Sequence, residues 1–269
     1  RGAGLTMAEI AAKDVKALRD ATGAGMMDAK KALTECNGDF EAASQMLREK
    51  GLAKAATRSD RDNVEGAIGL AVDGSRAALV HLKCETDFSA KSDGFLALVD
   101  ELTAAVLAEG EGAVEVRSSA IDDLRITIKE NIEVGVVTLV EAAEGNVLDT
   151  YLHVQDGRGV NGVVVEGSGV NQEALHQVAL HIAFAKPTAL TRDEVASDLV
   201  EKERTALLEI TKAEGKPEQA WDKIVEGRLT GWFRETVLLE QGLHGDKISV
   251  ADTLNGGRIE RFAQAYLGV

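Results

Sequence analysis

Cysteine is scarce in this sequence, which has only Cys36 and Cys84 among its 269 residues. Two cysteines are too few for a disulfide framework and fit a reducing cytosol. No apolar run approaches the ~20 residues that a membrane-spanning helix needs, and no segment has the form of a signal peptide. These absences predict a cytoplasmic protein that does not enter a membrane.

Positive charge is also in short supply. The sequence has 30 lysines and arginines against 45 acidic residues, a formal net charge of −15. Proteins that bind nucleic acid usually carry a basic stripe, so we expect no direct nucleic-acid binding, although an acidic chain can still contact RNA locally. Neither a phosphate-binding loop nor a Gly-x-Gly-x-x-Gly motif follows any predicted strand, so we predict no bound nucleotide or other cofactor.

Groups with the chemistry of catalysis are few. His81, Cys84 and Asp87 are close in sequence, but closeness along the chain does not make a catalytic triad, and a solitary cysteine at a strand end usually packs. His176 and His181 are five residues apart, not the four of a zinc-binding pair, so no metal site is predicted. We therefore predict no bond-making activity; a hydrolase that uses Cys84 is the weakest alternative.

What the sequence does have is apolar material for a globular fold, at 45% of its residues. Its length allows one to three domains. Residues 1–6 read as a tag remnant before a natural start at Met7, and we leave them out of the fold prediction.

Residues 7–56 are predicted to form a docking domain of three short helices. The first ends at the Thr-Gly-Ala-Gly loop of residues 22–25, and the second follows over 26–36. Asp39 is placed to cap a third helix, which we expect to end at Gly51. The arrangement resembles the ubiquitin-associated domain. The polar, aperiodic residues 57–63 are predicted to be a linker.

Met26 and Met27 directly follow the glycine-containing loop and have two interpretations. They can fill the core behind a tight interhelix turn. They can also form an exposed, adaptable apolar patch, because methionine suits interfaces. The sequence alone leaves both open.

An internal repeat follows the linker, and we divide it into a core subdomain over 64–145 and a second over 146–269. Each copy has a strand, an Asp-Gly turn, a second strand, a junction and a helix. The predicted elements are 65–72, 77–82 and 95–107 in the first copy, 147–154, 160–165 and 172–184 in the second, and a short helix at 121–128 and a strand at 132–142 between them. An antiparallel sheet with helices on one face explains each copy.

The last part of the chain interrupts this pattern. Residues 193–213 and 218–229 are predicted to form an antiparallel helical hairpin, within the range 193–230. The closing residues 232–267 mix short helix and strand, with an edge strand that completes the second sheet. The predicted fold class is α+β: a three-helix domain, then two repeated sheet-and-helix subdomains with an inserted helical hairpin.

The two copies differ at the junction between second strand and helix. The first reads Cys-Glu-Thr-Asp-Phe over 84–88, whereas the second reads Gly-Ser-Gly over 167–169, which we interpret as a plain flexible connection. Thr86 and Asp87 are residue types that cap a first helical turn. Phe88 is either a plug that packs back on its helix or a wedge presented to a partner. The scaffold does not need an aromatic here, which favours the wedge.

Two motifs carry a family resemblance. Glu85-Thr86-Asp87-Phe88 with Ala90-Lys91 resembles the core motif of the bacterial elongation factor Ts family, the nucleotide exchange factors of elongation factor Tu. The N-terminal signature of that family is similar to Leu18-Arg19, Thr22-Gly23-Ala24-Gly25-Met26-Met27-Asp28 and Lys30-Lys31-Ala32-Leu33. Ser89 departs from the pattern, because the family usually has an apolar residue there. This departure bears only on how that position packs.

The resemblance implies a guanine-nucleotide exchange factor that binds elongation factor Tu in its GDP-bound and nucleotide-free forms. It implies that residues 86–89 (Thr86, Asp87, Phe88 and Ser89) contact the partner and dislocate its Mg²⁺. It also implies that the helical hairpin is the coiled-coil excursion of the family. Further contacts are implied or expected at Leu18, Arg19, Met26, Met27, Lys30 and His153, the last being equally consistent with a plain rim residue.

A non-enzymatic adaptor is the alternative function. In it the three-helix domain binds partner helices and the repeat is a structural platform. Homodimerisation through the core or the hairpin stays open.

Overall fold

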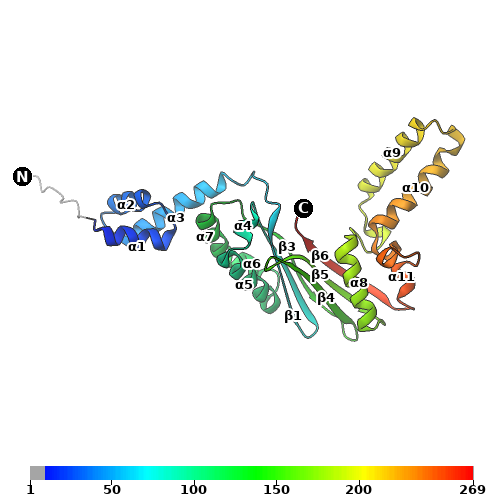
Figure 1. Cartoon of the computed structure of the whole chain (residues 1–269), viewed down its shortest axis with the longest axis horizontal. Helices are drawn as coiled ribbons and strands as arrows, with labels where there is room; N and C mark the ends of the chain where they lie inside the picture. The colour runs from blue at the N-terminus through cyan, green and yellow to red at the C-terminus, as the bar shows by residue number, and fades with distance from the viewer. Residues whose placement is uncertain (1–9, 269) are drawn as a thin grey trace, which may run out of the picture.

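The computed structural model describes residues 10–268, so the residues interpreted as a tag remnant lie outside it. The molecule is elongated, with three N-terminal helices at one end, two sheets in the middle and a helical hairpin at the other end (Figure 1). Among the described residues, no helix is both long and apolar enough to cross a membrane. The mixed fold confirms the predicted α+β class.

The three predicted N-terminal helices are present as α1 (Ala12–Thr22), α2 (Met26–Glu35) and α3 (Phe40–Ala56). Their shared core consists of buried small and aliphatic side chains, including Leu18 and Leu33. Asp39 caps α3 as predicted, because its Oδ1 accepts a hydrogen bond from the backbone N–H of Ala42 at 3.0 Å.

The prediction that Gly51 ends the third helix is wrong. Helix α3 continues through Gly51 to Ala56 and packs against α7 (Ser118–Ile128). A Cβ atom at Gly51 would lie only 2.9 Å from Cγ1 of Ile126. The glycine therefore permits a close helix–helix approach rather than a stop, and Arg48 ties the same two helices together through Asp123.

Every predicted element of the first copy is present. Its antiparallel sheet has the order β1-β2-β3, and α5 covers one face. The strands are β1 (Glu65–Asp73), β2 (Arg76–Cys84) and β3 (Glu133–Glu141), and the helices are α4 (Asp87–Ala90), α5 (Asp93–Glu109), α6 (Ala113–Val116) and α7.

The second copy repeats this plan with the sheet order β4-β5-β6 and α8 on its outer face. Its elements are β4 (Val147–Gln155), β5 (Arg158–Ser168), α8 (Gln172–Ala185) and β6 (Arg258–Tyr266). Among the described residues, strand β6 pairs with β5 alone, which confirms the edge strand predicted near the C-terminus.

The two sheets stack face to face between α5 and α8, which gives four layers (Figure 1). Alternate residues of β2 point to opposite layers: Leu79 packs against the second sheet and Val80 against the α5 side. Gly159 of β5 lies so close to the first sheet that a Cβ atom there would be 2.1 Å from the carbonyl oxygen of Ile68. The stack fixes the two junctions relative to each other.

The predicted hairpin is present as α9 (Ser197–Ala213) and α10 (Trp221–Thr236), but three of its boundaries are wrong, since residues 218–220 form a 3-10 turn (η2) before α10. Residues 192–194 form a separate 3-10 turn (η1), because Val195 is extended and Glu194 accepts a hydrogen bond from the N–H of Leu190. Helix α10 continues past Leu229 because Phe233, one turn later, is also buried. Three further short helices, η3 (Leu238–Glu240), η4 (Leu243–Gly245) and α11 (Val250–Thr253), lead to β6.

Candidate functional site

The junction between β2 and α5 presents one large apolar side chain to solvent. Thr86 caps the short helix α4, because its Oγ1 accepts a hydrogen bond from the N–H of Ser89 at 3.2 Å. Phe88, in the middle of α4, is 84% exposed. The interpretation of Phe88 as a local plug is therefore wrong, since the ring does not pack back on its own helix.

Glu130 holds this junction in place from the loop before β3. Its Oε2 accepts hydrogen bonds from the backbone N–H groups of Glu85 at 3.0 Å and Thr86 at 3.1 Å. Its Oε1 accepts from the hydroxyl groups of Thr86 at 2.7 Å and Ser89 at 2.6 Å. One carboxylate thus receives four hydrogen bonds, and bonds to a charged acceptor are the stronger kind.

The next residue of the same loop ties down the segment before β1. The Asn131 amide donates to the carbonyl oxygens of Arg61 at 2.8 Å and Ser59 at 3.3 Å. Its backbone N–H donates to Oε1 of Glu85 at 2.6 Å. The residues predicted to be a linker are therefore attached to the junction side of the core.

Asp87 is held by a lysine that also reaches the second subdomain. Nζ of Lys91 lies 2.8 Å from Oδ2 of Asp87 and 3.3 Å from Oδ2 of Asp156, at the turn between β4 and β5. The hydrogen bond and positive charge of Lys91 lower the pKa of Asp87. Asp87 is therefore an exposed, ionised carboxylate on the residue directly before Phe88.

The turn between β4 and β5 is anchored under this site. Arg158 is buried, and it donates to the carbonyl oxygen of Gly66 at 2.6 Å and to Oε2 of Glu65 at 2.7 Å. His153 is exposed on the strand that leads into the same turn, with Nδ1 3.5 Å from the hydroxyl of Tyr151. The fold therefore places His153 on a strand whose tip is tied to the junction.

Cys84 has no features of a nucleophile. Burial, with the nearby charge of Glu130, raises the pKa of its thiol to about 12, and its Sγ lies 3.2 Å from the carbonyl oxygen of Thr86. His81 is buried, and burial lowers its pKa to about 4. Within residues 10–268, no three His, Cys, Asp or Glu side chains gather in a way that could hold a metal ion.

The candidate residues of the three-helix domain divide into surface and core. Met26 is 46% and Met27 75% exposed, so they do not fill the core behind the loop. Lys30 is exposed, and Arg19 pairs with its neighbour Asp20. Leu18 is fully buried in the core of the domain, so its expected contact with a partner is replaced by a packing role.

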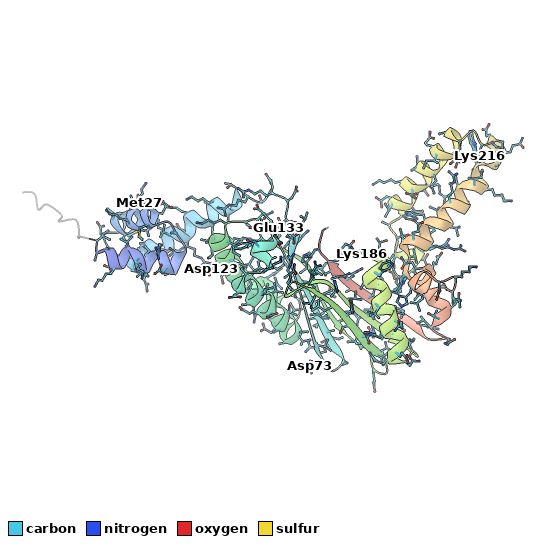
Figure 2. All side chains as sticks on the ribbon, in the orientation of Figure 1. Met27, Asp73, Asp123, Glu133, Lys186 and Lys216 are labelled. Atoms are coloured by element: carbon cyan, nitrogen blue, oxygen red, sulfur yellow. The ribbon has the colours of Figure 1, made fainter. Side chains whose placement is uncertain are left out.

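These exposed methionines are far from Phe88. Figure 2 places Met27 at the end of the molecule opposite Lys216, which marks the tip of the hairpin. The structure therefore brings residues 86–89 together at the centre and leaves the methionine patch as a separate surface.

The second junction differs from its predicted form. Gly167 and Ser168 belong to β5 and pair with Ile259 and Arg258 of β6, so they are not a flexible connection. A Cβ atom at Gly167 would lie 2.6 Å from Cγ2 of Val170, which explains the glycine. No side chain comparable to Phe88 is presented there.

Sequence reasoning missed Glu130 and Asp156. Glu130 lies more than forty residues along the sequence from the groups that it binds. The hydrogen bond between Glu85 and Asn131 also joins residues more than forty positions apart. The one available signal for Glu130 was a glutamate two residues before the predicted strand 132–142, which has no specificity by itself.

Comparison with known proteins identifies the family. A sequence model described as elongation factor TS matches residues 85–268. The chain is 45% identical to elongation factor Ts of Cutibacterium acnes, covering 96% of this chain and 99% of that protein. It is 42% identical to elongation factor Ts of an Arthrobacter species, with 98% and 99% covered, and 44% identical to that of Clavibacter michiganensis, with 87% and 89% covered. The chain therefore belongs to the elongation factor Ts family.

Proposed function

We propose that this protein is a guanine-nucleotide exchange factor that binds elongation factor Tu with GDP and promotes GDP release during translation elongation. The observation that carries the proposal is the exposed Phe88 ring on a clamped junction beside an ionised Asp87. The four hydrogen bonds to Glu130 hold the junction so that the Phe88 ring stays exposed to water. Burial of such a large exposed apolar side chain in a partner is favourable.

In the proposed mechanism, Phe88 wedges between elements of the partner and displaces packed side chains near the Mg²⁺ and phosphates. Asp87 adds negative charge, which disfavours the arrangement that holds GDP phosphates and Mg²⁺. Thr86 and Ser89 act by shape, because both hydroxyls are engaged by Glu130. Linkage requires that GDP weakens the binding of this protein by the same factor as this protein weakens GDP.

The wedge needs anchoring surfaces elsewhere. Burial of one phenylalanine contributes roughly 1.5–3 kcal/mol, on the order of a hundredfold in affinity. We assign the remaining binding to the exposed Met26, Met27 and Lys30 with the adjacent Arg19, and to His153 near the β4–β5 turn. The distance between these surfaces implies an extended contact with the partner.

The test follows release of fluorescent GDP from purified elongation factor Tu with the wild-type chain and with Phe88→Ala. We expect the variant to bind but to lose at least tenfold in release rate, since roughly 1.5–3 kcal/mol of wedge burial is removed. Phe184→Ala is the matched control, because Phe184 is 83% exposed but lies at the end of α8. Equal release by wild type and Phe88→Ala would overturn the wedge.

The exposed methionine patch supports a second candidate, the adaptor function. If the wild-type chain binds elongation factor Tu without accelerating release, the exchange proposal fails and the adaptor is favoured. A Met26→Ala/Met27→Ala variant that then loses binding would place the adaptor surface on the three-helix domain.

A further inference from the structure

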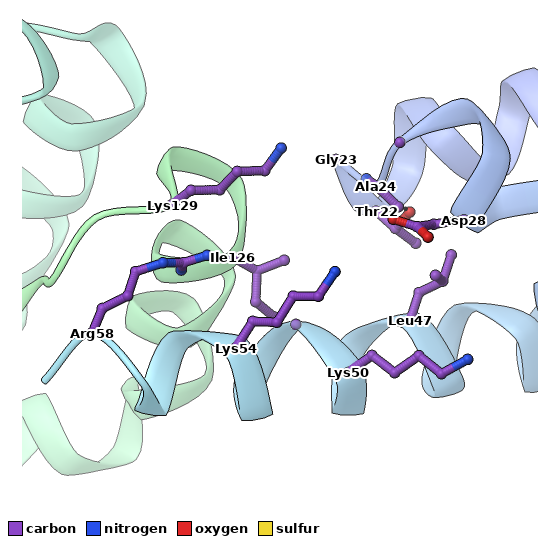
Figure 3. Close-up of a pocket in the computed structure, with 12 residues that line it drawn as sticks. Thr22, Gly23, Ala24, Asp28, Leu47, Lys50, Lys54, Arg58, Ile126 and Lys129 are labelled. Carbon is purple, nitrogen blue, oxygen red and sulfur yellow. Dashed lines mark hydrogen bonds between the residues drawn. The ribbon is translucent and has the colours of Figure 1, made fainter.

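A cavity lies on the seam between the three-helix domain and the core, and none of residues 86–89 lines it. Its volume is about 240 Å³, room for roughly eight water molecules at about 30 Å³ each. It is partly open to solvent and is lined by the α1–α2 loop, by α3 and by the C-terminal end of α7 (Figure 3). Nothing in the proposed exchange mechanism uses it.

Cationic side chains dominate its lining. Lys50 and Lys54 are four residues apart on α3, Arg58 lies in the turn that follows this helix, and Lys129 joins them from the end of α7. Residues four apart share one face of a helix, so Lys50 and Lys54 border the same cavity, and the turn after α3 adds Arg58 to the lining. Figure 3 shows Lys54 and Lys129 extending into the open space, with the Arg58 guanidinium directed toward Ile126.

Most of this charge is left without a partner. Lys50 is paired with Glu35 at 3.3 Å. Across residues 10–268, no acidic side chain lies within ion-pairing distance of Lys54, Arg58 or Lys129, and Nη1 of Arg58 is buried with no hydrogen-bond partner. An unpaired buried guanidinium N–H is costly unless it meets an acceptor.

The surroundings make this concentration of charge unusual. The whole chain has a formal net charge of −15, yet this lining contains four cations and one carboxylate, that of Asp28. A recess lined by one sign of charge focuses the field and attracts counter-ions. The chain as a whole is acidic, which argues against a phosphate-binding surface, but the lining of this cavity is positively charged.

We propose that the cavity binds inorganic phosphate. Lys54, Arg58 and Lys129 supply charge-assisted hydrogen bonds to its oxygens. Asp28, on the opposite wall, accepts a hydrogen bond from the P–OH that inorganic phosphate keeps at neutral pH. Sulfate has no such proton, and a phosphate monoester loses its last one above a pKa of about 6.

Binding here joins two parts of the chain. The ligand bridges α3 and the α1–α2 loop of the three-helix domain to Lys129 of the core, beside the existing contacts of Gly51 with Ile126 and Arg48 with Asp123. A ligand that binds only the docked arrangement stabilises that arrangement by mass action. Phosphate therefore strengthens the attachment of the three-helix domain to the core.

The test is isothermal titration calorimetry of the full chain at pH 8 and constant ionic strength, with inorganic phosphate, sulfate and adenosine monophosphate in turn. We expect phosphate to bind about tenfold more tightly than either other anion, since it alone retains a proton for Asp28. Arg58→Gln and Lys54→Gln should each weaken phosphate binding about tenfold. Lys216→Gln, an exposed change at the hairpin tip, is the matched control and should leave it unchanged.

Asp28→Asn separates a designed site from general attraction to positive charge. It should raise the affinity for sulfate and abolish the preference for phosphate. Equal binding of phosphate and sulfate to the wild-type chain, or wild-type phosphate binding by Arg58→Gln, overturns the proposal. Because the readout is anion binding to the free chain, the outcome is independent of whether the protein promotes GDP release.

Discussion

The two copies of the sheet-and-helix unit connect the second strand to the helix in different ways. In the first, the chain leaves β2, forms the separate turn α4 and exposes Phe88, with the whole junction fastened by Glu130. In the second, β5 continues to Ser168 and stays paired with β6 beyond a register shift between Glu166 and Gly167, and Gly167 lets Val170 pack closely. One junction is built from polar contacts to a distant loop, the other from strand pairing and close packing.

The difference shows what the fold requires and what it does not. Strand pairing and a glycine are enough to make the connection, as the second copy demonstrates. The first copy uses a carboxylate with four donors to fix a turn whose central side chain makes no contribution to the core. The four hydrogen bonds to Glu130 therefore hold this turn in place without any contribution from burial of the Phe88 ring.

The largest effect that would break this comparison is expected from Glu130→Ala. It leaves two backbone N–H groups and two hydroxyls of the junction without their acceptor. We expect a loss of about 2–3 kcal/mol in unfolding free energy and faster hydrogen exchange at the amides of Glu85 and Thr86. Urea unfolding measures the free energy of unfolding, and NMR measures the amide hydrogen exchange.

Glu130→Gln is the matched control, because it keeps the shape but replaces one acceptor oxygen with a donor. Its loss should be smaller than that of Glu130→Ala, and Phe88 should stay exposed in both variants. Unchanged amide exchange at Glu85 and Thr86 in Glu130→Ala would show that the carboxylate does not hold the junction.

A second carboxylate, Glu166 next to the second junction, should give an effect of about 2 kcal/mol. Burial raises its pKa, but hydrogen bonds from Asn146, the N–H of Ala143 and Arg261 outweigh burial, so the pKa of Glu166 is lowered overall. Because the pKa is lower in the folded state, ionised Glu166 stabilises the fold at pH values above the ordinary pKa of 4.5. This stabilisation is lost as the pH falls through the folded-state pKa.

Glu166→Gln should therefore cost most near pH 7, and its cost should shrink as the pH is lowered through the folded-state pKa of Glu166, because the stabilising ionised form is then lost. Urea unfolding at pH 7, 5 and 3 measures the difference. Exchange activity near pH 7 should survive in the folded variant, since Glu166 does not touch the Phe88 junction. A cost that is the same at all three pH values would contradict the assigned role of its charge.

Local patterns in the sequence predicted most of the fold. Hydrophobic period, Asp-Gly turns and the Asp39 cap located the strands and helices, because these signals act over a few residues. Gly51 and Gly167 were misread for one reason. A glycine looks the same in sequence whether it ends an element or lets another element approach, and here the neighbours Ile126 and Val170 decide.

The candidate site was predictable at its centre and not at its supports. The Thr-Asp-Phe junction stood out because its repeat partner lacks it. Glu130 and Asp156 reach the junction only after β3 and the β4–β5 turn are placed by the stacked sheets. The prediction that Leu18 contacts a partner was wrong because a sequence motif does not show which of its residues face the core. Leu18 is buried in the core of the three-helix domain.

The smallest effect concerns Ser89, where the family resemblance predicts an apolar residue. Ser89 is 6% exposed and donates to Glu130, so Ser89→Ala removes one of four donors and leaves three. We expect a cost of about 1 kcal/mol in urea unfolding, with GDP release from elongation factor Tu close to wild type. Ser168→Ala at the second junction is the control; its hydroxyl meets Glu260 at an exposed position, so the cost should stay below about 0.5 kcal/mol. If the two serines cost the same, the polar fastening of the first junction contributes nothing beyond an ordinary surface contact, and the contrast between the junctions reduces to Phe88 alone.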